Sequence, residues 1–165
     1  MKFIKAILAA TAVTTFATSA HAQDSNVYIN AGVQTFEFDT YNILGRVGYN
    51  FNEYFGVAGE ASIGISGDEV DGIDVDTPYS FGGYLTGRYP VAEQFDIFAR
   101  VGYTVINVEA DDGFDEIDAD LDGFAVGAGI QYNFDEQNGV RLGYTYNDAD
   151  GADVDVIDLV YVRRF

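Results

Sequence analysis

The chain is dominated by a two-residue alternation of apolar side chains with small or polar ones, and this pattern restricts its fold more than any other feature. In the segment "YNILGRVGYNFNEYFGVAGEASIGI" (residues 41–65), one set of alternate positions is mostly aromatic or aliphatic, and the other is mostly Asn, Gly, Ser and single charges. Successive side chains of a β-strand point to opposite faces, so each such segment predicts a strand with one apolar face. We therefore expect an all-β fold.

The alternation recurs in eight segments, which predicts eight antiparallel strands. They cover residues 27–36, 41–51, 55–65, 79–89, 95–105, 124–134, 140–146 and 154–165. The connections differ in length, since 52–54, 90–94 and 135–138 are short whereas 66–78, 109–122 and 147–153 are long. Spanning strands of a membrane barrel have roughly 9–11 residues. An even number of strands of this length favours an up-and-down transmembrane β-barrel.

The composition of the two strand faces indicates which one meets the membrane. The face opposite the apolar one is mostly Gly, Ala, Ser and Asn, which suits a narrow interior, and the aromatic residues of the apolar face gather at the strand ends. Aromatic girdles of this kind are typical of lipid-facing barrels, whose short turns lie in the periplasm. With eight strands, both termini are then periplasmic. A soluble barrel of the lipocalin type, with its apolar face inward, is the alternative.

Residues 1–22 are expected to be a signal peptide that is removed. Lys2 and Lys5 precede a short apolar run, and Ala20-His21-Ala22 supplies small residues at a cleavage site. The run is too short for a membrane-spanning helix. Residues 23–165 would then form one domain, the barrel.

Charge and reactive side chains exclude several classes of function. Residues 23–165 hold all 27 acidic residues, six arginines and no lysine, a formal charge of −21. Such a surface repels nucleic acid. These residues contain no cysteine and, without His21, no histidine, so thiol- and imidazole-based catalysis are unavailable. We expect neither enzyme activity nor a cofactor.

The last strand carries a resemblance to a known family. Ile157, Leu159, Tyr161 and the terminal Phe165 share one face, and Arg163 departs from the apolar pattern on that face. Together with the eight alternating segments, the chain resembles the small outer-membrane barrels of the OmpA, OmpX and Opa type, among porin-family proteins. The resemblance implies a Gram-negative outer membrane, with lipid and lipopolysaccharide around the barrel. It also implies that the final strand is an assembly signal read by the barrel-assembly machinery.

Several charged residues are predicted to face the interior, where eight strands leave room for little beyond side chains. Buried arginines need carboxylate partners, so we expect an ion-pair network that fills the lumen and a structural or surface-interaction role for a monomer. A narrow passive pore for small solutes or ions is the alternative. Arg46, Glu60 and Arg100 should lie at one depth, and Asp158 should lie higher in the barrel. Arg88, Asp96 and Arg141 should lie nearer the periplasmic end.

The four outer connections are strongly acidic, with 18 of the 27 acidic residues and no basic residue; they cover residues 37–40, 66–78, 109–122 and 147–153. Asp118, Asp120, Asp122 and Gly123 have the spacing that opens an EF-hand calcium loop. Gly129 stands where that loop needs a bidentate Glu, so no EF-hand is expected. A looser Ca²⁺ or Mg²⁺ site that bridges the loops to lipopolysaccharide phosphates is one interpretation. A solvated acidic surface is the other.

Overall fold

The computed structural model describes residues 26–36, 40–66, 68–70, 73–76, 79–111, 116–149 and 152–165. The expected signal peptide, residues 1–22, lies outside these ranges. The described residues form ten antiparallel strands. The strands are β1 (Val27–Phe36), β2 (Tyr41–Asn50), β3 (Phe55–Ser66), β4 (Asp68–Val70), β5 (Ile73–Asp76), β6 (Tyr79–Ala92), β7 (Phe95–Asp111), β8 (Glu116–Asn133), β9 (Asn138–Ala149) and β10 (Ala152–Arg164).

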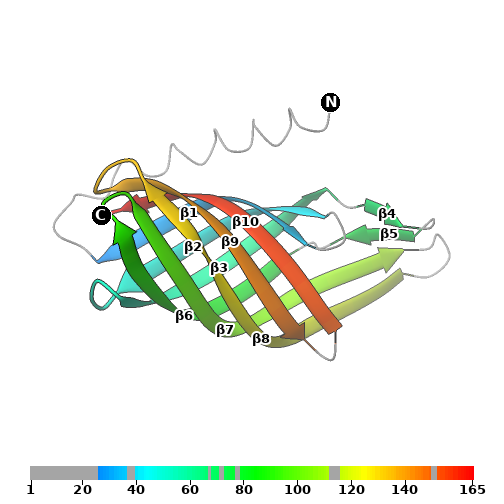
Figure 1. The fold of residues 1–165 in the computed structure, drawn as a ribbon. Coiled ribbons are helices and arrows are strands. Elements are labelled where there is room, and N and C mark those ends of the chain that lie inside the picture. The colour runs from blue at the N-terminus through cyan, green and yellow to red at the C-terminus, as the bar shows by residue number, and fades with distance from the viewer. Residues whose placement is uncertain are drawn as a thin grey trace.

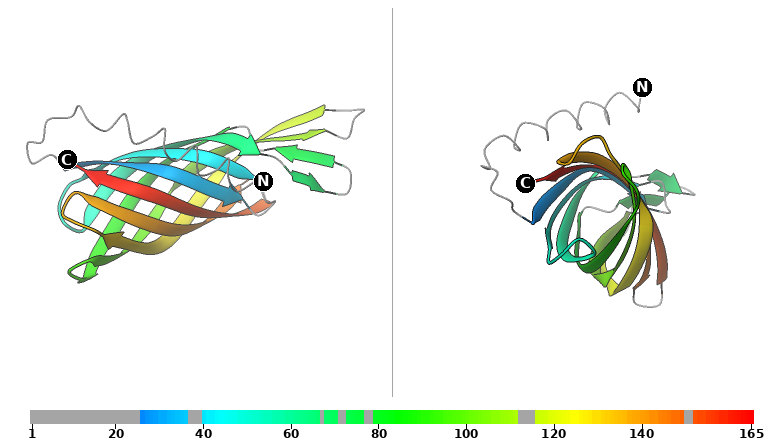
Figure 2. Two further views of the ribbon diagram at one scale, coloured as in Figure 1. Left: turned by 90° about the horizontal axis from the view of Figure 1, so that it is seen from above. Right: turned by 60° about the vertical axis from the view of Figure 1, so that its left-hand side comes forward.

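Eight of the strands close into a barrel. Neighbours are antiparallel in the order β1-β2-β3-β6-β7-β8-β9-β10, and β10 pairs with β1 to complete the ring. Figure 1 shows the strands tilted across the barrel axis, and the right-hand view of Figure 2 shows the wall curving round the interior. The predicted fold class, an eight-stranded antiparallel up-and-down barrel, is confirmed.

The two ends of the barrel differ. Short turns join β2 to β3, β6 to β7 and β8 to β9 at the end where the chain terminates (Figure 1). In two of them a side-chain oxygen accepts from backbone N–H groups. Asn52 Oδ1 accepts from Tyr54, and Asp135 Oδ1 accepts from Gln137 and Asn138, each at 2.8 Å. Such contacts stabilise tight turns and help to fix strand register.

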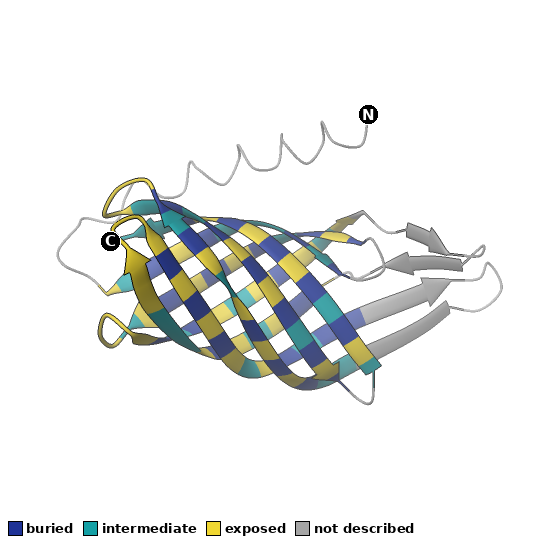
Figure 3. Ribbon diagram, viewed as in Figure 1, coloured by how far each residue is buried: buried dark blue, intermediate teal, exposed yellow. Residues whose placement is uncertain are grey.

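The apolar face of each strand points outward. Buried and exposed residues alternate along much of the barrel wall, which gives the chequered pattern of Figure 3. Phe124, Ile63 and Leu85 are 73%, 68% and 61% exposed, whereas Asn30 and Asp158 are fully buried. A soluble barrel would show the opposite arrangement, so the lipocalin-type alternative is wrong. Among the described residues, no helix is long and apolar enough to cross a membrane.

The strands at the other end run further than the alternation predicted. Residues 109–122, expected as a loop, are largely a ladder, because β7 and β8 remain paired out to Asp111 and Glu116. Asp118 and Asp120 lie on strand β8, with an extended backbone unlike that of an EF-hand loop. Residues 66–78 contain the short hairpin β4–β5, which pairs with the end of β7. Beyond the closed barrel both faces of a hairpin can be solvated, so pairing continues there without an apolar face.

Large inward rings fit over glycines of neighbouring strands. A Cβ at Gly48 (β2) would overlap the ring of Tyr28 (β1), and one at Gly129 (β8) would lie 2.6 Å from Phe98 Cε1 (β7). Only a residue without a side chain allows these rings to lie flat against the wall. The glycines of the interior therefore make room for the side chains that fill it.

Candidate functional site

Four charged side chains from four strands meet inside the barrel. Arg46 (β2) donates from Nε to Glu60 Oε2 (β3) at 2.7 Å, and its Nη2 contacts the same oxygen. Arg100 (β7) donates from Nη1 to Glu60 Oε2 at 2.9 Å and from Nη2 to Asp158 Oδ1 (β10) at 2.7 Å. Arg46 Nη2 also lies 3.4 Å from Asp158 Oδ1. These four residues form a closed cycle of ion pairs, which we call the central quartet.

The central quartet is removed from solvent. The side chains of Arg46 and Asp158 are 1% and 0% exposed, and Glu60, the most exposed member, is 7% exposed. Each buried charge loses hydration worth several kcal/mol, which attraction offsets only when the geometry is good. Here each carboxylate is shared by two guanidinium groups, and the two positive and two negative charges cancel. Removal of one member would leave an uncompensated buried charge.

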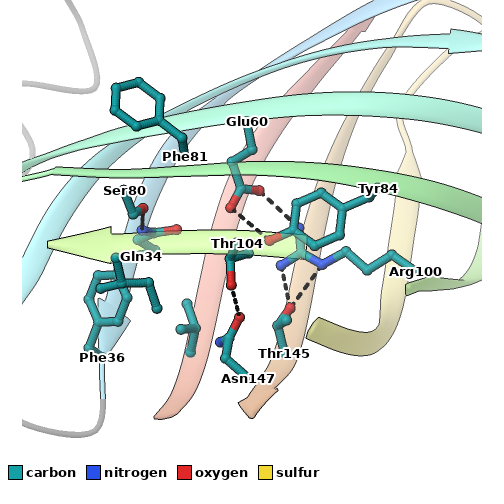
Figure 4. A pocket seen from close by; sticks show the side chains of 12 residues that line it. Gln34, Phe36, Glu60, Ser80, Phe81, Tyr84, Arg100, Thr104, Thr145 and Asn147 are labelled. Atoms are coloured by element: carbon teal, nitrogen blue, oxygen red, sulfur yellow. Dashed lines mark hydrogen bonds and ion pairs between the residues drawn. The ribbon is translucent and has the colours of Figure 1, made fainter. Parts of the chain in front are cut away.

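Neutral side chains from two further strands complete the quartet. Thr145 Oγ1 (β9) accepts from Arg100 Nε at 2.8 Å. The Tyr84 ring (β6) stacks on Arg100, with 4.7 Å from Cζ to the ring centroid, and its hydroxyl donates to Glu60 Oε1 at 3.5 Å. Figure 4 shows these side chains converging from different strands. Six of the eight barrel strands are thus connected through the lumen.

A polar layer and then an apolar cluster lie on the side of the quartet away from the short turns. Gln34 Nε2 donates to Ser62 Oγ at 2.8 Å, and the hydroxyls of Ser62 and Ser80 lie 2.7 Å apart. Thr104 Oγ1 donates to Asn147 Oδ1 at 3.0 Å. The cavity lined by this layer and the quartet has a volume of about 10 Å³, room for about one water (Figure 4). The apolar cluster consists of Phe36, Ile106, Val154 and Val156, with Leu121 packed against it.

Arg141 (β9) is buried without a carboxylate partner among the described residues. Its Nε and Nη2 donate to Gln131 Oε1 at 2.9 and 2.7 Å. Its Cζ lies 4.5 Å from the centroid of Phe98 and 5.6 Å from that of Tyr28. The amide oxygen and the two ring faces take the place of a counter-ion. This part of the interior therefore carries one formal positive charge without an acidic partner in the described ranges.

A second ion-pair cluster lies at the end with the short turns, in an open depression of about 500 Å³. We call this depression the turn-end vestibule. Asp96 Oδ2 (β7) accepts from Arg88 Nη1 (β6) and Arg164 Nη2 (β10), both at 3.3 Å, and from Asn133 Nδ2 (β8) at 3.0 Å. Arg164 Nη2 also donates to Asn133 Oδ1 at 2.7 Å. The end of the last strand is thus tied across the lumen to the strands on the opposite wall.

The structure distributes the predicted interior residues over three places. Arg46, Glu60, Arg100 and Asp158 meet in the central quartet, Arg88 and Asp96 meet in the vestibule, and Arg141 joins neither cluster. Asp158 was expected higher in the barrel than Arg46, Glu60 and Arg100, yet its Oδ1 lies 2.7 Å from Arg100 Nη2 and 3.4 Å from Arg46 Nη2. Because the strands are tilted, residues at one depth are displaced along neighbouring strands, so that counting from a turn does not give depth.

Sequence reasoning missed several partners of these residues. Arg164 follows Asp158, Val160 and Val162 on the inward face of β10, so simple alternation is a signal that could have found it. Thr145 and Gln131 are neutral residues on strands with many polar inward positions. Nothing in the sequence marks them as partners of Arg100 and Arg141.

The acidic outer surface lies only partly within the described residues. On the outward face, Tyr144 OH donates to Asp155 Oδ1 at 2.6 Å, and Tyr146 OH donates to Asp153. In the described part of the chain, no group of three or more His, Cys, Asp or Glu is arranged to hold a metal ion. The side chains of most acidic residues in the outer connections fall outside the description. The divalent-cation interpretation therefore stays a prediction.

The residues of the predicted assembly signal lie together on the outer face of β10. Ile157, Leu159 and Tyr161 are 50%, 51% and 39% exposed. The backbone N–H of Phe165 donates to Val27 O on β1 at 3.1 Å, which continues the pairing of the first and last strands to the end of the chain. The terminal aromatic residue thus lies where the barrel closes.

Sequence comparisons place the chain among known proteins. It matches the model of the outer membrane protein beta-barrel domain over residues 6–165. A 22 kDa outer membrane protein of Rhizobium leguminosarum bv. viciae is 32% identical over 124 residues, which cover 71% of this chain and 57% of that relative. The chain therefore matches little more than half the length of the relative.

The barrel is also similar to solved structures. The N-terminal β-barrel domain of Pseudomonas aeruginosa OprF superposes with a TM-score of 0.69 at 15% identity, covering 87% of this chain and all of that one. Ail, the attachment invasion locus protein of Yersinia pestis, gives a TM-score of 0.62 at 19% identity, covering 86% and 97%. Ail is also known in complex with the heparin analogue sucrose octasulfate. At these identities the likeness is one of fold.

Proposed function

Because this chain belongs to the outer-membrane β-barrel protein family, we propose that it is a structural and surface-displaying barrel whose interior is plugged by its own side chains. The observation that carries the proposal is the central quartet, which joins β2, β3, β7 and β10 through the lumen. A barrel of eight strands has an interior just wide enough for side chains to fill. The quartet fills it with charges that fix the relative positions of distant strands.

Two barriers in series argue against the alternative, a narrow passive pore. An ion that entered from the vestibule would meet the quartet, where it would have to displace a guanidinium group from a buried carboxylate. It would then meet the apolar cluster around Phe36 and Ile106, a constriction of the kind that excludes water and ions. The first of these steps costs several kcal/mol. We therefore favour a closed lumen.

The orientation and assembly follow from the same architecture. We place the short turns and both termini in the periplasm, because outer-membrane barrels have short periplasmic turns and longer outer loops. Residues 1–22 act as the signal peptide in this proposal, and the outward face of β10 with Phe165 acts as the assembly signal. Among the described residues, closure leaves the eight barrel strands without a free edge for a second copy to pair with, and only the short strand β4 beyond the barrel keeps one, which supports a monomer.

The acidic outer connections set the chemistry of any surface partner. A polyanion such as the one that Ail binds would be repelled here, because these connections carry no basic residue. Lipopolysaccharide phosphates bridged by Ca²⁺ or Mg²⁺ fit this charge better. Calorimetry of the refolded barrel tests the bridge, and a lack of millimolar or tighter Ca²⁺ binding would remove it.

A catalytic role is not part of the proposal. Residues 23–165 contain neither His nor Cys, so imidazole-based acid–base catalysis and thiol nucleophiles are missing. The buried carboxylates Glu60 and Asp158 are neutralised by arginines and enclosed. We therefore assign these two carboxylates a structural role in the barrel.

Planar-bilayer recording combined with gel migration tests the proposed function. A folded barrel should migrate differently before and after boiling, and it should give no discrete channels when inserted into the bilayer. Discrete single-channel steps from heat-modifiable protein would favour the pore and contradict the plug. A chain that stays soluble without detergent and shows no shift on boiling would contradict the membrane location as well.

A further inference from the structure

Arg163 is the one arginine of residues 23–165 whose side chain lies on the outer face of the barrel. It continues the outward row of Leu159 and Tyr161 on β10, while its neighbours Val162 and Arg164 point inward. The other five arginines lie in the central quartet, beside Gln131, or in the turn-end vestibule. A charged side chain in a lipid-facing row requires a local explanation, because its cost rises steeply toward the middle of the bilayer.

The contacts of Arg163 leave its charge without a counter-ion in the described part of the chain. Arg163 Nη1 donates to Asn138 Oδ1 at 2.7 Å, and the Tyr161 hydroxyl donates to the same oxygen. The guanidinium carbon lies 5.9 Å from the centroid of the Phe165 ring. No carboxylate of the described ranges comes within 4.0 Å of its nitrogens, and its Nε is enclosed without a hydrogen-bond acceptor.

The carboxylate of Asp135 is hydrogen-bonded within its own turn. Asp135 accepts hydrogen bonds from the side chain of Asn138 and from the backbone N–H of Gln137, and these bonds are the main cause of its lowered pKa. Attraction to the Arg163 charge adds to this lowering of the pKa. Asn138 thus connects the two residues, since its Nδ2 donates to Asp135 and its Oδ1 accepts from Arg163.

Arg163 lies at the depth of an aromatic girdle. Across the β9–β10 ladder its partner is Asn138, whose carbonyl accepts from the N–H of Phe134 at 2.9 Å. The Phe134 ring packs against Tyr132 with 5.5 Å between centroids, and Tyr132 packs against Phe95 at 4.9 Å. Such girdles mark the level of the lipid headgroups. A guanidinium group at this level faces phosphates rather than hydrocarbon.

We propose that Arg163 binds the phosphate of an anionic phospholipid on the outer face of the barrel, with Tyr161 and Phe165 flanking the headgroup. A guanidinium group presents paired N–H donors that match phosphate oxygens, and Asn138 pre-orients it by holding one nitrogen. The inference rests on the membrane location of the proposed function and adds a specific lipid site. Its test does not depend on which end faces the periplasm, because a mixed micelle offers the same headgroups to both ends of the barrel.

Native mass spectrometry of the refolded chain tests the site. Residues 23–165 are refolded in zwitterionic micelles with equal amounts of phosphatidylglycerol and phosphatidylcholine that have identical acyl chains. We expect the unmodified chain to retain phosphatidylglycerol preferentially and Arg163→Gln to lower that preference about fivefold, the usual effect of one basic residue at a membrane surface. Arg163→Lys should keep part of the preference. Arg164→Gln, which removes the same charge from the adjacent inward residue, is the matched control and should keep all of it.

Three results would overturn the site: no headgroup preference in the unmodified chain, an unchanged preference in Arg163→Gln, or an equal loss in Arg164→Gln. A heat-dependent shift on gels verifies folding of each variant, so that failure of the barrel itself is distinguished from failure of the site. If Arg163→Gln does not fold, side-chain Nε–Hε NMR of the unmodified chain gives the answer. Addition of phosphatidylglycerol should shift one arginine Nε–Hε resonance, and a spectrum unchanged by the lipid counts against the proposal.

Discussion

At the scale of single residues, Glu60 is the member of the central quartet whose loss should matter most. Its Oε2 accepts from both Arg46 and Arg100. Glu60→Ala would leave two buried arginines with Asp158 as their only acidic partner among the described residues, a kind of loss that typically costs about 3–5 kcal/mol. We expect the free energy of unfolding in micelles, measured by urea titration, to fall by this amount. The matched control is Glu53→Ala, an exposed turn residue, which should change it by less than about 0.5 kcal/mol. Equal stability of the two variants would show that the quartet does not hold the barrel together.

Two glycines of β2 provide a test of packing at the same scale. A Cβ at Gly48 would overlap the Tyr28 ring inside the barrel, whereas a Cβ at Gly45, on the outward face, would meet nothing within 4 Å. Gly48→Ala should lower the unfolding free energy by about 1–3 kcal/mol, the usual cost of overpacking. Gly45→Ala should leave it unchanged or raise it by about 0.5 kcal/mol, because alanine restricts the unfolded chain. A similar loss in both variants would point to backbone conformation rather than to the Tyr28 contact.

The same residues mark the limit of what the sequence could predict. Alternation is enough to turn Arg46, Glu60, Arg100 and Asp158 inward, because a strand has only two faces. Their meeting in one cycle depends on strand tilt and on the stagger of the closed sheet, which a single sequence does not encode in a readable form. Arg141 illustrates the point, because its inward position was predicted while its partners, an amide and two rings, were not.

At the scale of elements, β10 has two roles that can be separated by experiment. Its pairing with β1 closes the barrel, and Phe165 contributes to this through its backbone N–H, which any residue retains. Phe165→Ala should therefore change the unfolding free energy of refolded protein by less than about 1 kcal/mol. If the side chain is read during assembly, however, the amount of folded barrel in the outer membrane of cells should fall severalfold. Phe134→Ala, which removes an exposed ring at the same end, is the control. An equal fall for both variants would mean that any girdle aromatic has this effect.

The hairpin of β7 and β8 shows how an element can be misassigned for a physical reason. In residues 116–122, acidic residues alternate with Ile117, Ala119 and Leu121, which is itself a strand pattern. The density of aspartates suggested a loop, and the structure continues the ladder instead. The pattern of a strand thus persisted beyond the membrane-spanning part, where an apolar outer face was no longer needed.

At the scale of the whole molecule, charge is sorted along the barrel axis. The arginines lie in the lumen, in the turn-end vestibule and at the nearby girdle, whereas the outer connections are acidic and carry no basic residue. Each arginine has a specific partner within the protein and, for Arg163, the proposed lipid phosphate as well. The excess negative charge therefore remains at the end opposite the short turns. This polarity gives the barrel two chemically different mouths, and its function depends on which of them faces the cell exterior.

Single-cysteine labelling reports that orientation, because the chain contains no cysteine of its own. Glu136→Cys lies in the short turn after β8, and Asp153→Cys lies at the start of β10 at the opposite end, both at exposed positions. We expect a membrane-impermeant maleimide to label Asp153→Cys in intact cells and Glu136→Cys only after the outer membrane is permeabilised. Labelling of both variants in lysed cells verifies that each thiol is reachable. The reverse result in intact cells would mean that the barrel has the opposite orientation, with the vestibule, Arg88 and Arg164 at the cell surface. Labelling of neither cysteine before permeabilisation would contradict a surface-exposed end altogether.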